Sequence, residues 1–145
     1  MKLQRYDHLV ITTQDTEKCR HFYRDILCME EDTRNDRLAF RFGNAKINIH
    51  RQKAEFLPAA RNVTYGSQDV CLIAEGDIEE IKQEILDKGY PVELGPVKRT
   101  GALGEISSIY LRDPDGNLIE IAVYAEYNLL STWLHGYVKG DCFKV

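Results

Sequence analysis

The sequence predicts an α+β fold made of two similar halves, and three observations support this prediction. The chain has 145 residues, of which 43% are hydrophobic and 29% are charged, which is the composition of a globular domain. Several short alternating patterns surround one amphipathic helical pattern, and the same order begins again after residue 66. The pattern therefore predicts that each half has the element order strand, helix, strand, strand, strand. We expect one domain over residues 1–124, with repeats at about 3–55 and 67–124.

The first half is predicted from its periodicities. Tyr6–Thr12 is rich in β-branched residues and predicts a strand in which His8 lies on the same face as every second residue. A helix is predicted from about Thr16 to Leu27, because apolar residues recur there on one face. Residues 51–66 show no periodicity and predict a linker, with a helical turn around 54–60. Further strands are expected near Met29–Thr33, at Leu38–Phe42 and at Ala45–His50.

The second half repeats this order. Asp69–Ala74 predicts a strand, and Asp77 followed three positions later by Glu80 is a helix N-cap signature. Gly89 is typical of the position just after a helix end. The remaining strands are expected at Val92–Leu94, Ile106–Arg112 and Asn117–Val123. A long glycine-containing loop is expected between the first two of these, at Gly95–Gly104.

Composition excludes several classes of partner. Lys and Arg total 19 against 23 Asp and Glu, and the pI is about 5.6, so nucleic acid is not expected. No apolar run reaches the roughly 20 residues that a membrane span needs. The first residues lack a signal-peptide hydrophobic region, which predicts a cytoplasmic protein with reduced thiols. Two of the cysteines, Cys19 and Cys71, lie in apolar patterns and are expected in the core. Residues 125–145 are expected to form a tail with a short amphipathic helix.

Four segments carry a family resemblance. They are D-H-L-V-I-T at 7–12, H-F-Y-R-D-I-L at 21–27, K-I-N-I-H at 46–50 and L-R-D-P-D-G-N-L-I-E-I at 111–121. These segments resemble the vicinal oxygen chelate superfamily, which includes glyoxalase I, methylmalonyl-CoA epimerase, fosfomycin-resistance proteins and extradiol dioxygenases. Together with G-P-V-K-R-T-G-A at 95–102, they resemble the glyoxalase domain-containing protein 5 group and bacterial virulence-associated glyoxalase-like proteins.

The resemblance covers roughly residues 3–124 and carries structural implications. It implies two βαβββ repeats whose curled mixed sheets form a cup, with the helices outside and a metal inside. It also implies a homodimer that acts on a small-molecule substrate.

The resemblance implies metal ligands on the first and fourth strands of each half. His8 matches the first-strand histidine of the family, and Glu120 matches the last-strand glutamate. Asp69 stands where many relatives have histidine, and Asn48 stands where glyoxalase-like members have glutamate. Asp69 can bind the same ions, and His50 shares a strand face with Asn48 and is a further candidate ligand. Alternatively, Asp69 and His50 hydrogen-bond each other or the backbone, and the site binds metal poorly.

A divalent ion such as Ni, Zn, Mn, Fe or Co would act as a Lewis acid on two adjacent substrate oxygens. In the glyoxalase-type chemistry that the resemblance implies, a carboxylate ligand also moves the proton. Glu120 is the first candidate for this catalytic role, and Asp69 is the second. Asn48 argues against straightforward glyoxalase I activity, because a full proton shuttle needs two opposed carboxylates. Asn48 is a weak neutral ligand through its carbonyl oxygen, and it is also a candidate substrate contact.

Four further residues are candidates for binding an anionic substrate. Tyr110 precedes Glu120 by ten residues, where fosfomycin-resistance relatives carry a substrate-contacting tyrosine, and Arg112 shares its strand face. Lys98 and Arg99 lie on the glycine-flanked segment and would close over an anion. The alternatives are a core tyrosine, a rim arginine and a solvated basic pair.

Three functions remain open at this point. The first is a metal-dependent lyase or isomerase of glyoxalase I type, acting on a small oxygenated or thiol-conjugated substrate by bidentate chelation. The second is a protein of bleomycin-resistance type that sequesters a ligand without chemistry. The third is an extradiol-type dioxygenase, which matches less well because Asp69 replaces a histidine. The first is our expectation.

Overall fold

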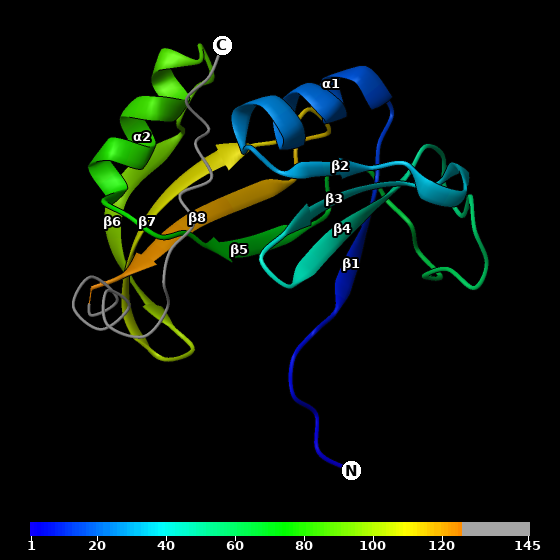
Figure 1. The fold of residues 1–145 in the computed structure, drawn as a ribbon, viewed down its shortest axis with the longest axis horizontal. Helices are drawn as coiled ribbons and strands as arrows, with labels where there is room; N and C mark the ends of the chain where they lie inside the picture. Colours follow the sequence, from blue (N-terminus) through cyan, green and yellow to red (C-terminus); the bar gives the residue numbers. More distant parts are fainter. Residues whose placement is uncertain (126–145) are drawn as a thin grey trace. The chain divides into compact units, whose positions relative to one another are not determined.

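A computed structural model describes residues 1–125 of the chain (Figure 1). This part divides into two compact units, which are described separately. Unit 1 comprises Met1–Asp69 together with Arg112–Leu118. Unit 2 comprises Val70–Leu111 and the described chain from Ile119 on. The units follow the sequence repeat, except that the turn before the last strand belongs to unit 1.

Unit 1 contains a four-stranded mixed sheet. Its strand order is β1-β4-β3-β2, with β1 parallel to β4 and the other pairs antiparallel. The strands are β1 (His8–Thr12), β2 (Glu30–Asp32), β3 (Leu38–Phe42) and β4 (Ala45–His50). Between β1 and β2, α1 (Thr16–Arg20) continues directly into a π-helical segment, η1 (His21–Ile26), and a 3₁₀ turn, η2 (Arg34–Asp36), precedes β3.

The helical segment of unit 1 covers one face of this sheet. Phe22 and Tyr23 are fully buried, and the Tyr23 ring stacks on Phe40 of β3 with a centroid separation of 5.4 Å. Other buried members of this core include Cys19, Ile26, Leu38, Ile47 and Ile49. Burying each large apolar side chain stabilises the unit by about 1.5–3 kcal/mol. Because one face is committed to this core, the alternate residues of β1 and β4 are left on the open face.

A buried polar network holds the turn at 112–118 in unit 1. Asp113 Oδ2 accepts hydrogen bonds from the Tyr23 hydroxyl at 2.8 Å and from Asn117 Nδ2 at 2.7 Å. Asn117 Oδ1 accepts from the backbone N–H of Gln68 at 2.9 Å, and Asp115 Oδ1 accepts from that of Gln14 at 2.9 Å. The D-P-D-G-N sequence therefore forms a turn and also connects it by hydrogen bonds to the helical segment and to the segments that contain Gln14 and Gln68.

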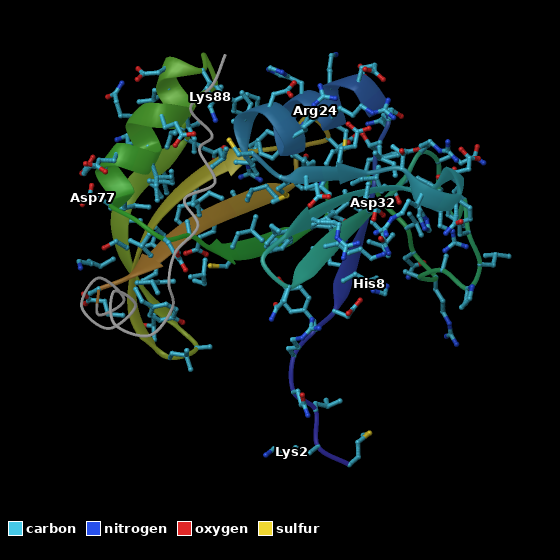
Figure 2. All side chains as sticks on the ribbon, viewed as in Figure 1. Lys2, His8, Arg24, Asp32, Asp77 and Lys88 are labelled. Carbon is cyan, nitrogen blue, oxygen red and sulfur yellow. The ribbon has the colours of Figure 1, made fainter. Side chains whose placement is uncertain are left out.

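Unit 2 repeats the architecture with a sheet of order β5-β8-β7-β6. The strands are β5 (Asp69–Ile73), β6 (Leu94–Gly101), β7 (Gly104–Arg112) and β8 (Leu118–Tyr124), and the helix is α2 (Ile78–Asp87). The predicted cap is confirmed, because the Asp77 carboxylate accepts from the backbone N–H groups of Glu79 and Glu80. Gly89 has a φ of +75°, as expected just after a helix end. Figure 2 shows Asp77 and Lys88 at opposite ends of α2.

Four predictions about local structure were wrong. The strand expected at Val92–Leu94 is absent before Leu94, where β6 begins. The expected loop at Gly95–Gly104 is mostly strand, because β6 continues after a register shift between Leu94 and Val97 that contains Gly95 and Pro96. Residues 54–60 form turns and bends without a helix. Cys71 is exposed on β5, although Cys19 is buried as expected. The π-helical continuation of α1 was also not anticipated; there, the Leu27 N–H donates to the Phe22 carbonyl five residues earlier at 3.0 Å.

No helix within residues 1–125 is both long enough and apolar enough to cross a membrane. The amphipathic helix expected in the tail lies outside the described residues.

Candidate functional site

The open face of the unit 1 sheet brings three predicted site residues to one cavity. The parallel register pairs Val10 with Asn48 and Thr12 with His50, and His8 begins β1 on the same face. His8, Asn48 and His50 all line a cavity of about 460 Å³. Its other wall is supplied largely by the segment 56–68, which contributes several apolar side chains.

His8 is oriented by its neighbour in the chain. His8 Nδ1 lies 3.0 Å from Asp7 Oδ1, and the hydrogen bond to His8 lowers the pKa of the Asp7 carboxyl. A carboxylate on one ring nitrogen leaves the other nitrogen, Nε2, available as a metal ligand or hydrogen-bonding group. The His8 side chain is half exposed. Figure 2 shows the residue on β1.

His50 and Arg37 flank the same aromatic ring. The His50 side chain is 9% exposed and meets Phe56 edge to face, with ring centroids 5.4 Å apart. The Arg37 guanidinium carbon lies 4.4 Å from the Phe56 ring centroid. All three side chains line the unit 1 cavity.

Unit 2 has a cavity of its own, with a volume of about 430 Å³. Glu120 of β8, Tyr110 of β7 and Arg99 of β6 line it, together with Cys71 and Tyr124. Arg99 Nε donates a hydrogen bond to the Tyr110 hydroxyl at 3.1 Å. Glu120 Oε1 is buried and has no hydrogen-bond partner among the described residues. A buried carboxylate oxygen without a donor is costly, so this atom is suited to an external partner.

The Tyr110 hydroxyl lies between opposite charges. Burial raises the pKa of Tyr110, the Arg99 guanidinium opposes this shift, and the neighbouring Glu120 carboxylate raises it further. The phenol therefore stays protonated across the neutral range and can donate a hydrogen bond.

The remaining predicted residues do not line either of these two cavities. Asp69 is the exposed first residue of β5. Lys98 forms an exposed ion pair with Glu105 at 2.8 Å. Arg112 is exposed at the end of β7, and one of its nitrogens lies 3.4 Å from the Gly116 carbonyl oxygen.

Within neither unit does the described chain gather three or more His, Cys, Asp or Glu side chains that could hold a metal ion. Two of the predicted ligands nonetheless fit a divalent ion by their own surroundings. His8 presents a free ring nitrogen, and Glu120 presents a buried oxygen without a donor.

The sequence did not reveal several residues that line these cavities or contact the residues that do. Asp7 was visible next to His8, but its hydrogen bond to the ring was not anticipated. Phe56 lies in a segment without periodicity, so no pattern could place it. Arg37 immediately precedes β3, two positions before Ala39. Because alternate residues of a strand share a face, this spacing was the one available signal that Arg37 lies on the open face of the sheet.

Comparison with known proteins identifies the family. The model of the glyoxalase/bleomycin resistance protein/dioxygenase superfamily matches residues 5–121. The chain belongs to this superfamily. Similar proteins include a virulence protein, STM3117, of Salmonella typhimurium and a glyoxalase domain-containing protein, RDO1, of Mycosarcoma maydis. The first is 48% identical over 86% of this chain and 87% of its own, and the second is 41% identical over 87% and 72%.

Solved structures share the fold. The crystal structure of STM3117 has a TM-score of 0.82 to this chain and covers 86% of it and 99% of its own length. An integron cassette protein from the V. cholerae mobile metagenome also has a TM-score of 0.82, at 44% identity over 86% and 98%. Lactoylglutathione lyase of Agrobacterium tumefaciens has a TM-score of 0.63 at 22% identity over 84% and 95%, a likeness of fold alone.

Proposed function

We propose that this protein is a divalent-metal-dependent lyase or isomerase of glyoxalase I type that acts on a small oxygenated or thiol-conjugated substrate. The observation that carries the proposal is Glu120, at the last-strand position of the superfamily pattern. One of its carboxylate oxygens is buried in the unit 2 cavity without a donor. The name of one relative, a glyoxalase domain-containing protein that is 41% identical to this chain, supports this class of activity.

The proposed metal ligands are His8, Asp69 and Glu120, with His50 as a further candidate. Imidazole nitrogen and carboxylate oxygen suit Ni, Zn, Mn, Fe or Co. Two carboxylates in the set favour an ion that prefers oxygen ligands. When bound, the ion would polarise two adjacent oxygens of the substrate and stabilise charge that develops on them.

The protein's own groups have distinct proposed roles. Glu120 holds and returns the proton, because a carboxylate of this kind is a suitable general base. Tyr110 donates a hydrogen bond to a substrate oxygen, and Arg99 keeps the phenol in place through its 3.1 Å hydrogen bond. Lys98 and Arg112, which are exposed and line neither cavity, would attract an anionic substrate through their charge alone.

Asn48 limits the reaction that this set can perform. Its neutral amide lines the unit 1 cavity, where glyoxalase-like members carry a glutamate. An amide cannot accept a proton under these conditions, so the Glu120 carboxylate alone would have to remove the substrate proton and return it. We therefore expect lower glyoxalase I activity than in relatives with two opposed glutamates.

We also propose that the protein is a homodimer, as the resemblance implies.

An assay with the methylglyoxal–glutathione hemithioacetal tests the proposed function. The protein is stripped with chelator and loaded separately with Ni, Zn, Mn, Fe and Co. We expect a rate above the metal-only background with at least one ion, and loss of that rate in Glu120→Gln. Glu79→Gln, an exposed carboxylate on α2, is the matched control and should keep the rate. No rate with any ion would contradict the glyoxalase I assignment and favour the ligand-sequestering alternative.

A further inference from the structure

The geometry of unit 1 points to a second capability: we propose that its cavity binds a small organic carboxylate with an apolar body, through the Arg37 guanidinium. The cavity is the one that the proposed ligands His8 and His50 line, so the inference adds a ligand class to the proposed site, but it does not require a bound metal. It rests on the charge balance of the cavity, on the availability of Arg37, and on the apolar wall opposite the sheet.

The charge balance favours an anion. A second cavity of about 430 Å³ adjoins the first, and both are lined by Arg37 and Asn48. Asp32 is the one carboxylate among the described residues that line the two cavities. Its charge is already matched, because it forms ion pairs with Arg34 at 2.6 Å and Arg41 at 3.1 Å. These partners hold the pKa of Asp32 far below its usual value.

Lys46 and Arg37 are the lining cations left over from this balance, and Arg37 is the one that lines both cavities. None of the described residues forms an ion pair with it or accepts a hydrogen bond from its guanidinium. Its guanidinium carbon lies over the Phe56 ring, 4.4 Å from the ring centroid. The N–H donors of a guanidinium lie in its plane and form a fork that matches a carboxylate. The contact with Phe56 therefore holds the group at the cavity, and none of the described residues uses its donors.

The rest of the cavity suits an apolar body. The wall contributed by the segment after β4 contains mainly apolar side chains, and His50 packs on Phe56 from the sheet side. The apolar lining residues of this segment are Phe56, Leu57, Pro58, Ala59, Ala60 and Val63. A volume of about 460 Å³ lies within the usual range for small-molecule sites. An inorganic anion would satisfy Arg37 but leave this wall uncovered.

Isothermal titration calorimetry on the chelator-treated full chain tests the proposal, with phenylacetate, phenylacetamide and inorganic phosphate as probes. Phenylacetate should bind, and phenylacetamide should bind about tenfold more weakly, because it lacks the charge that pairs with Arg37. Phosphate should also bind more weakly, because it cannot use the apolar wall. Arg37→Gln should weaken phenylacetate binding by about tenfold or more.

Arg41→Gln is the matched control. Arg41 lies on β3, is exposed, and pairs with Asp32, but it lines neither cavity. Phenylacetate affinity in this variant should stay within about twofold of wild type. If Arg37→Gln does not fold, the wild-type comparison of phenylacetate with phenylacetamide decides the proposal.

Three results would overturn the proposal. The first is that phenylacetate does not bind at millimolar concentration, and the second is that phenylacetamide or phosphate binds as tightly as phenylacetate. The third is that Arg37→Gln and Arg41→Gln lose the same amount of phenylacetate affinity. The protein in this experiment carries no metal, so its outcome is independent of the glyoxalase assay.

Discussion

Cys19 couples the stability of unit 1 to alkaline pH. Its side chain is 1% exposed, and burial, with help from the charges of Asp113 and Asp115, raises the pKa of the thiol from 9.0 to about 12. The folded protein therefore holds this proton over a range in which the unfolded chain releases it. The stabilising contribution is complete below pH 9.0 and is lost as pH rises from 9.0 to about 12.

We expect the free energy of unfolding to fall over this window with a component from Cys19 of up to about 1.4 kcal/mol per pH unit. Urea denaturation at a series of pH values measures the slope. Cys19→Ala should show a shallower decline than wild type, and Cys28→Ala, which removes an exposed thiol, should not. Identical slopes for all three proteins would show that the buried thiol does not contribute.

The hydroxyl of Tyr23 is a second residue whose effect can be measured alone. It donates to Asp113 at 2.8 Å inside the buried network, so Tyr23→Phe leaves a buried carboxylate with one donor fewer. We expect a loss of about 1–3 kcal/mol in the free energy of unfolding. Tyr6→Phe removes a hydroxyl from a residue that is 54% exposed and serves as the control. A change below about 0.5 kcal/mol in Tyr23→Phe would contradict the structural role of the network.

At the residue scale, parity within strands was the most reliable guide to the candidate site. His8, Asn48 and His50 were expected on open faces, and the parallel register of β1 and β4 brings them to one cavity. The same reasoning failed for Cys71, because an apolar neighbourhood in sequence does not tell which face of β5 is covered. Phe56 could not be anticipated, because its position depends on an irregular segment folding back over the sheet.

At the scale of elements, the turn at 112–118 depends on close contact with the segment before β5. Gly66 has a φ of +67°, and a Cβ atom added there would lie 2.3 Å from the Asp115 carbonyl oxygen. A backbone oxygen cannot move aside as a flexible side chain can. The D-P-D-G-N turn and Gly66 therefore form one packed unit.

Gly66→Ala should lower the free energy of unfolding clearly more than Gly43→Ala, by about 1–3 kcal/mol. Both glycines have positive φ, so both variants pay a similar conformational cost, but nothing lies within 4 Å of a Cβ at Gly43. Thermal or urea unfolding of the two variants beside wild type gives the difference. Equal destabilisation would mean that the contact with Asp115 relaxes at no cost.

Regular elements were predicted well where one local signal dominated. The strands at Leu38–Phe42 and Ala45–His50 and the helix cap at Asp77 follow directly from alternation and capping. β6 was missed because Gly95 and Pro96 are typical of loops, whereas pairing with β7 carries the strand past them. Tertiary pairing overrode local propensity there.

At the scale of the whole molecule, the repeated order of elements predicted two similar halves, and the family resemblance implied a curled mixed sheet in each; the strand order within each sheet required the structure. Each unit places a helix against one face of a four-stranded sheet (Figure 1). Residues of the other face line a cavity in each unit. The candidate ligands follow from the same repeat, since His8 and Glu120 begin and end the superfamily pattern. The surroundings of these residues, namely Asp7 beside His8 and Tyr110 beside Glu120, required the structure.

Metal content is the decisive measurement for this molecule. The purified protein is stripped with chelator, loaded with each of Ni, Zn, Mn, Fe and Co, dialysed and analysed for metal. Wild type and Glu79→Gln should retain a stoichiometric amount of at least one ion, and His8→Ala and Glu120→Gln should retain far less. Wild type without stoichiometric metal, or variants that retain as much as wild type, would contradict the assignment of His8 and Glu120 as metal ligands.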